Sequence, residues 1–207
     1  VPGESVPGVD YILPNLACLK GREKDVLGIL FTHGHYDHIG AIPYLAEKAG
    51  NPPLFASPLT KGIIKKRQEE FPMNAKLDIN DIGPGSKVEL GPFKVEFFHM
   101  NHNIVDNLGI FIQTPGGNVV QTSDFKFDET PMNDRPTDFR KLKEIGSRKI
   151  DFLMIDSTGA ENEGHSLSEK VIMENLDEIF ASSKGRIIAA TFASLINRIQ
   201  QIVALSE

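Results

Sequence analysis

The densest chemical pattern in the chain is a cluster of histidine and aspartate at residues 33–38. It reads His33-x-His35-x-Asp37-His38 and directly follows an apolar run. Imidazole nitrogens and carboxylate oxygens are ligands that Zn²⁺ accepts. Adjacent residues would crowd a single ion, so two ions with two of these ligands each fit the spacing better. The cluster therefore favours a two-metal site over the simpler alternative, a polar turn with helix-capping residues.

Two further candidate ligands, His102 and Asp124, lie farther along the chain, each just beyond an expected strand. Loops at strand ends are where a rigid scaffold presents functional residues, so these two can converge. An aspartate between two cations can bridge them, with one oxygen on each. His99 and His165 are weaker candidates, because His99 is expected on or beside the sheet and His165 in a solvated loop.

The elements that must position these residues alternate between strand and helix, which is typical of a mixed α/β domain. We predict strands over residues 26–31, 87–90, 93–99, 108–114, 119–122, 150–155 and 186–191, the sixth of them buried. Helices are predicted over residues 39–49, 60–70, 139–145 and 166–181, and a last one begins near Ser194. Residues 115–118 carry a hairpin signal between two of the strands.

Composition narrows the class of protein. The chain has 207 residues, of which 40% are hydrophobic and 24% charged, and these proportions exclude a disordered or fibrous chain. The formal net charge of −6 has the wrong sign for binding nucleic acid by bulk charge, so a polyanionic substrate needs local positive charge. A single cysteine, Cys18, suits a reducing, cytoplasmic location, and no apolar run predicts a membrane partner. The unpartnered apolar face of the last helix predicts that the chain is a piece of a longer protein.

The ordered set of candidate ligands resembles the signature of the metallo-β-lactamase superfamily. Four flanking segments resemble, more narrowly, the ribonuclease J branch of the β-CASP nucleases: residues 101–106, 124–131, 156–161 and 191–194. The likeness runs from about residue 7 to the end of the chain. Several separated motifs in the same order make the resemblance specific.

The resemblance implies an α/β fold, an αββα sandwich that is truncated here. Residues 1–165 would form the metallo-β-lactamase domain without its opening strands, and residues 166–207 the start of a β-CASP domain. The first metal would take His33, His35 and His102, the second Asp37 and His38, and Asp124 would bridge the two. Asp156 matches a motif carboxylate beside the metals. Two downstream motif histidines, one of them a ligand of the second metal, would lie beyond residue 207.

The activity implied is that of a zinc-dependent ribonuclease with 5′→3′ exonuclease and endonuclease modes. Two Zn²⁺ ions, with Mn²⁺ as the alternative, would activate a hydroxide for attack on phosphorus, and Asp37 would help to orient it. Ser157, Thr158 and Ser194 are the predicted RNA or phosphate contacts, although Ser194 is equally suited to helix capping. RNA is the expected partner, together with a second copy of the chain and other RNA-decay proteins. The 207 residues alone are expected to have weak activity or none.

Some positions depart from the family pattern. Ser123 stands where the family usually has glycine, and Asn103 and Val105 replace its common serine and proline. Gly159 and Asn197 stand where asparagine and histidine are usual. None of these is a candidate ligand. Three other functions stay open: a DNA nuclease, a thioester or lactone hydrolase on the same fold, and a non-catalytic subunit of an RNA-degradation complex.

Overall fold

The structure is a computed structural model that describes residues 7–9 and 12–206. The chain divides into two compact units, Val1–Ile82 and Gly83–Glu207. Among the described residues, each unit contains a sheet of its own, with three strands in the first unit and five in the second. None of the helices in the described part of the chain combines the length and apolar character needed to cross a membrane.

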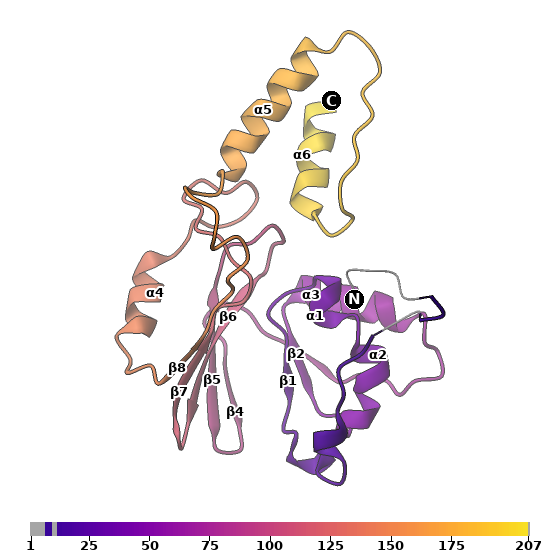
Figure 1. Ribbon diagram of the computed structural model, residues 1–207, viewed down its shortest axis with the longest axis vertical. Helices are drawn as coiled ribbons and strands as arrows, with labels where there is room; N and C mark the ends of the chain where they lie inside the picture. Colours follow the sequence, from indigo (N-terminus) through magenta and orange to yellow (C-terminus); the bar gives the residue numbers. More distant parts are fainter. Residues whose placement is uncertain (1–6, 10–11, 207) are drawn as a thin grey trace. The chain divides into compact units, whose positions relative to one another are not determined.

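The first unit is built on a parallel sheet with the strand order β1-β2-β3 (Figure 1). Its strands are β1 (Ile29–Leu30), β2 (Leu54–Ala56) and β3 (Ile79–Asp81). Its helices are α1 (Tyr36–Ile39), α2 (Ile42–Leu45) and α3 (Pro58–Gln68), with 3-10 helices at Ala17–Leu19, Glu23–Asp25 and Glu47–Ala49. Parallel strands need crossover connections, and these helices provide them. The buried core of the unit is formed by Phe31, Ile39, Ile42, Ala46, Leu54, Ala56, Ile64 and Ile79.

The helix predicted over residues 39–49 is wrong as a single element. The structure divides this region into the last residue of α1, the helix α2 and a 3-10 turn. Pro43 has no N–H group, so it cannot donate to the carbonyl of Ile39, as a continuous helix requires. At Gly40 a side chain has no room, because a Cβ there would lie 2.5 Å from the carbonyl oxygen of Tyr36. The helix that begins at Tyr36 therefore ends at Ile39, directly after the histidine cluster.

The second unit contains a sheet in the order β4-β5-β6-β7-β8. Its strands are β4 (Lys87–Leu90), β5 (Phe93–His99), β6 (Leu108–Thr114), β7 (Gly117–Gln121) and β8 (Phe152–Met154). The first four strands form an antiparallel meander, whereas β8 runs parallel to β7. The first three strands have their predicted bounds and the predicted hairpin is confirmed, whereas β7 begins two residues earlier than predicted and β8 is shorter than its predicted range of 150–155. Consequently β5, β7 and β8 all end at the same edge of the sheet.

Helix α4 (Phe139–Gly146) connects β7 to β8 and covers one face of this sheet (Figure 1). Asp138 caps the helix, since its carboxylate accepts a 2.9 Å hydrogen bond from the backbone N–H of Lys141. The buried residues between helix and sheet are Phe98, Met100, Phe111, Val120 and Ile145. Packing against α4 therefore fixes the end of β5, beyond which His102 lies.

An ion-paired carboxylate reinforces the attachment of α4. Glu96 of β5 lies on the face of the sheet that α4 covers and accepts hydrogen bonds of 2.6 Å from Lys141 Nζ and 2.7 Å from Arg148 Nη1. The pKa of Glu96 is lowered to about 2, mainly by the hydrogen bond from Arg148 and also by Lys141, although burial of the carboxylate acts in the opposite direction. Glu96 is consequently ionised in the folded protein over the whole neutral and mildly acidic range.

Strand β8 differs from its prediction in burial. The sequence predicts a buried strand, yet Phe152, Leu153 and Met154 are all exposed, by 61%, 54% and 49%. β8 is the outermost strand of its sheet, and successive side chains point to opposite faces. Both faces of the strand are therefore open in the described part of the chain.

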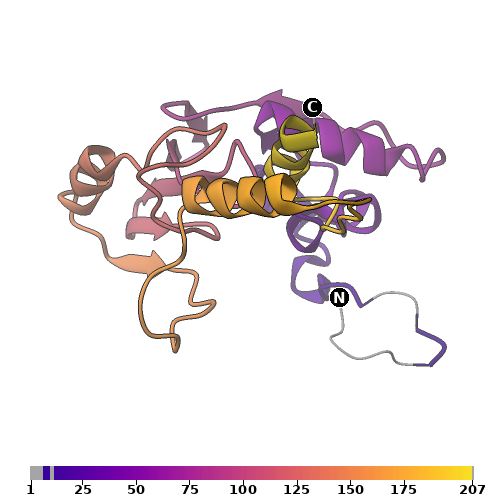
Figure 2. The same cartoon turned by 90° about the horizontal axis from the view of Figure 1, so that it is seen from above.

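The last part of the second unit is helical. Helices α5 (Glu169–Ser182) and α6 (Ile196–Ser206) lie side by side, as Figures 1 and 2 show. The strand predicted over residues 186–191 is wrong, because the structure has no regular element there and Ile188 is 89% exposed. A strand needs a neighbour to satisfy its backbone groups, and no strand of the described residues pairs with this segment. The domain boundary predicted at residues 165/166 stays a prediction.

Candidate metal centre

The turn that carries the histidine cluster follows β1 in the first unit. β1 ends at Leu30, earlier than predicted, and α1 begins at Tyr36 with His35 as its N-cap residue. Gly34 allows this turn to pass close to α3, since a Cβ at position 34 would lie 2.7 Å from the side chain of Ile63. Glycine is thus required at the position between His33 and His35, where the turn passes close to α3.

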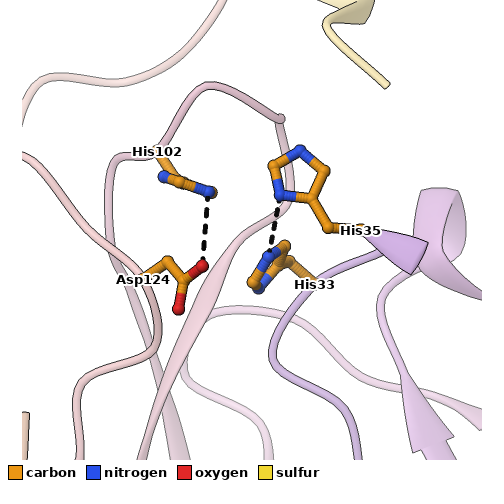
Figure 3. Close-up of side chains that lie close together, drawn as sticks. All are labelled: His33, His35, His102 and Asp124. Atoms are coloured by element: carbon orange, nitrogen blue, oxygen red, sulfur yellow. Dashed lines mark hydrogen bonds and ion pairs between the residues drawn. The ribbon is translucent and has the colours of Figure 1, made fainter. Parts of the chain in front are cut away.

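Two of the imidazoles are in direct contact. His33 Nε2 lies 3.1 Å from His35 Nδ1, as the dashed line in Figure 3 shows. The other ring nitrogen of His33, Nδ1, lies 3.0 Å from the hydroxyl of Thr32, and the His33 side chain is fully buried. The Thr32 contact orients the ring, so that Nε2 faces the neighbouring imidazole. Converging ring nitrogens are a donor set that suits a divalent metal.

Asp37 and His38, in the helix α1 directly after this turn, form a second pair of donors. His38 Nε2 lies 3.5 Å from Asp37 Oδ2, and the ring centroids of His38 and His33 are 4.1 Å apart. All four predicted ligands of residues 33–38 are therefore gathered within the first unit. They present three imidazoles and one carboxylate.

His102 and Asp124 are neighbours in the second unit. His102 lies three residues beyond the end of β5, and Asp124 three residues beyond the end of β7. Since both strands end at one edge of the sheet, the two loops meet there. His102 Nε2 lies 3.8 Å from Asp124 Oδ2, which Figure 3 also shows. These two predicted ligands are thus brought together from separate strands.

Asp156 joins the same edge from the end of β8. Its backbone N–H donates to the Thr122 hydroxyl over 3.3 Å, and its carboxylate accepts from the backbone N–H of Thr158 over 2.8 Å. Burial would raise the pKa of Asp156, but hydrogen bonds from Thr158 and the Phe125 backbone, together with nearby His102, lower it. Asp156 is therefore an ionised carboxylate beside the His102 loop.

The predicted phosphate contacts lie in two places. Ser157 and Thr158 are exposed in the turn after Asp156, where Thr158 already bonds to that carboxylate. Ser194 lies in a turn, and α6 begins two residues later at Ile196. Helical hydrogen bonding starts at Leu195, whose carbonyl accepts from the N–H of Ile199. Ser194 is thus slightly outside the helix that it was expected to open.

Sequence reasoning missed the buried polar residues that support the second half of the site. Asn101, Asn107 and Ser123 are each 1% exposed and hydrogen bonded. Asn101 directly precedes His102 and Ser123 directly precedes Asp124, so their position was the only signal for these two, and Asn107, five residues after His102, carried none. His99 belongs to a separate cluster, where it lies 3.2 Å from the carbonyl oxygen of Arg135. His165 is exposed, as predicted.

Comparison with known proteins identifies the class. A family model described as a beta-lactamase superfamily domain matches residues 7–181. The chain therefore belongs to the β-lactamase superfamily. A solved structure of a protein of unknown function from Enterococcus faecalis matches it with a TM-score of 0.63 at 16% identity, over 86% of this chain and 44% of that one. The predicted α/β fold class is confirmed.

Within the superfamily, the chain is similar to ribonuclease J. Ribonuclease J of Thermus thermophilus is 34% identical over 100% of this chain and 37% of its own length. Ribonuclease J of Corynebacterium glutamicum is 38% identical over 98% of this chain and 28% of its own length. The predicted resemblance to the ribonuclease J branch is confirmed. The chain spans about a third of the length of these relatives.

Proposed function

We propose that the donors of the two units form one dinuclear metal centre that hydrolyses phosphodiester bonds in RNA. In this proposal His33, His35 and His102 hold one metal, Asp37 and His38 hold the other, and Asp124 bridges the two. The observation that carries the proposal is the pairing of donors inside each unit, His33 with His35 and His102 with Asp124. Each pair combines nitrogen or carboxylate donors that borderline divalent metals accept.

The donor set fits zinc better than a hard cation. Four of the six proposed ligands are imidazoles, whereas magnesium sites use mainly oxygen ligands. When bound, two such ions lower the pKa of water and neutralise charge on a phosphate. We take two Zn²⁺ ions as the cofactor, with Mn²⁺ as the alternative.

The residues of the chain have separate roles in this chemistry. Asp37 is the most exposed of the proposed ligands and orients the attacking water from the solvent side. Asp156, ionised and next to His102, holds that imidazole in place by its negative charge. The hydroxyls of Ser157 and Thr158, which are exposed, and of Ser194, which is partly buried, donate to phosphate oxygens. None of these roles requires bulk positive charge, which the chain with its net charge of −6 lacks.

RNA is the proposed substrate because of the similarity to ribonuclease J over nearly the whole chain. By the same similarity we propose both 5′→3′ exonuclease and endonuclease activity, a homo-oligomeric state and a cytoplasmic location. Residues 166–207 are proposed to begin a β-CASP domain.

The test is metal analysis combined with cleavage assays on the intact protein and its Asp124→Ala variant. The wild type is expected to hold two zinc ions and to cleave 5′-monophosphorylated RNA in preference to DNA of the same sequence. The variant is expected to lose zinc and cleavage together. Unchanged zinc content in the variant would remove Asp124 from the site, and equal cleavage of DNA would contradict RNA as the substrate.

A further inference from the structure

A buried asparagine connects the two loops that carry His102 and Asp124. Asn107 lies immediately before β6 and is 1% exposed. Its side-chain Nδ2 donates to the carbonyl oxygen of Asp124 over 2.8 Å and to that of Met100 over 3.2 Å. Met100 lies two residues before His102, so a single amide group holds the backbones of both ligand loops.

The orientation of this amide is fixed by its surroundings. Both carbonyl oxygens can only accept hydrogen bonds, so the NH₂ group of Asn107 must face them. The backbone carbonyl of Asn107 also accepts from the N–H of Met100 over 3.2 Å. Because both N–H groups of the Asn107 amide donate to these carbonyls, its Oδ1 points away from them. That oxygen needs a donor, because a buried acceptor without one costs about 1–3 kcal/mol.

Ser123 is that donor, and its backbone conformation is unusual. Its hydroxyl donates to Asn107 Oδ1 over 2.5 Å. The residue has a φ angle of 66°, in the left-handed region that glycine adopts more readily than serine. A second bond, from its own N–H to Gln121 Oε1 over 2.6 Å, holds this conformation. The glycine that is usual at this position would relieve the backbone but would give Asn107 no hydroxyl.

We infer that Asn107, oriented by Ser123, is a positioning residue of the metal centre. Its amide fixes the spacing of the His102 and Asp124 backbones and so the approach of their side chains to a shared ion. The fold itself does not depend on this contact alone, because the N–H of Lys126 also donates to the carbonyl of Asn101 over 2.9 Å. The inference rests on the proposed metal site but not on RNA as the substrate.

The test compares Asn107→Asp with the matched control Asn103→Asp in the intact protein. Aspartate at position 107 keeps the shape but replaces the donating NH₂ with an oxygen that repels both carbonyls. Asn103 is exposed on the same loop, next to His102, so its substitution adds the same charge without touching the network. We expect the affinity for Zn²⁺ alone to fall 10- to 100-fold in Asn107→Asp and less than threefold in the control, as supporting residues behind metal ligands usually behave.

Two readouts separate positioning from general destabilisation. The absorption spectrum of the Co²⁺-loaded protein at saturating metal reports ligand geometry, and it is expected to change in Asn107→Asp only. Thermal unfolding of the metal-free proteins shows whether the variant is folded. If Asn107→Asp does not fold, Ser123→Ala becomes the decisive variant, with an expected three- to tenfold loss of Zn²⁺ affinity.

The inference would be overturned if a folded Asn107→Asp variant had the zinc affinity and the cobalt spectrum of the wild type. If that variant does not fold, the same result in Ser123→Ala would overturn it. A wild-type protein that binds no zinc would overturn the proposed function and the inference with it. A wild type that binds zinc yet cleaves no RNA would overturn only the proposed function.

Discussion

The two halves of the candidate metal centre are built in opposite ways. In the first unit, four proposed ligands lie close together in the turn after a two-residue strand and in the helix α1 that follows it, and two of the imidazoles are in direct contact. In the second unit, His102 and Asp124 come from different loops and meet because β5 and β7 end at the same edge. A compact motif thus contains four of the six proposed ligands, while the sheet topology brings the remaining two together.

The support of the two halves differs as well. The first relies on close packing, since Gly34 lies against α3 with no room for a Cβ and His33 is fully buried. The second relies on buried hydrogen bonds through Asn107 and Ser123. We therefore expect the turn of the first unit to tolerate few changes in side-chain size. The loops at the sheet edge of the second unit are expected to tolerate few substitutions that remove a hydrogen-bond donor or acceptor.

Metal removal is expected to have the largest effect, because it acts on both halves at once. Dialysis against a chelator should lower RNA cleavage by roughly a thousandfold or more, and added Zn²⁺ should restore it. The measurement is cleavage of end-labelled RNA before and after metal return. If RNA cleavage persisted after complete metal removal, neither half of the candidate metal centre would be needed for the reaction.

Substitution of one ligand in the first half is expected to have the next largest effect. His35→Ala should reduce cleavage by roughly a hundredfold to a thousandfold, because an imidazole donor is lost. His165→Ala is the matched control, since that histidine is exposed in a loop. Equal activity of the two variants would show that the turn takes no part in the chemistry.

The ion pairs of Glu96 with Lys141 and Arg148 are expected to make the stability of the second unit depend on pH under acidic conditions. The pKa of Glu96 is lowered to about 2 in the folded protein, so its stabilising effect is present above pH 4.5 and is lost as pH falls toward 2. Glu96→Gln should therefore cost on the order of 2 kcal/mol of unfolding free energy at neutral pH and flatten its acid dependence over that window. Urea unfolding of wild type, Glu96→Gln and the exposed control Glu89→Gln, repeated from pH 7 to pH 2, checks this. The same pH dependence in wild type and Glu96→Gln would contradict it.

A smaller effect is expected at Asp156. Asp156→Asn keeps the shape but removes the charge beside His102, which should lower kcat about tenfold with little change in KM. Steady-state cleavage of a short RNA by wild type and variant measures this. A change confined to KM would instead make Asp156 a substrate contact.

The six proposed ligands could be named from the sequence, because their residue types are rare and closely spaced or follow clear strand signals, and their role as ligands stays a prediction. The sequence also located the antiparallel strands around His102, since β5 and β6 are rich in apolar β-branched and aromatic residues. The sequence did not predict short strands or helix interruptions, because these leave no periodic pattern of apolar residues. β2 and β3 have only three residues each, and Pro43 interrupts a segment whose apolar spacing is helical.

The supporting residues were beyond prediction for a physical reason. Asn107 has the composition of an ordinary loop residue, and its role arises only when two carbonyls from distant segments face its amide. Burial of Glu96 on the α4 side was equally hidden, because a charged residue in a strand is usually placed toward solvent.

The most direct test of the central claim is anomalous X-ray diffraction at the zinc edge from crystals of the intact protein. We expect two zinc peaks, one of them coordinated at about 2.0–2.1 Å by nitrogens of His33, His35 and His102 together. Zinc bound by ligands of only one unit, or no zinc at these residues, would contradict it.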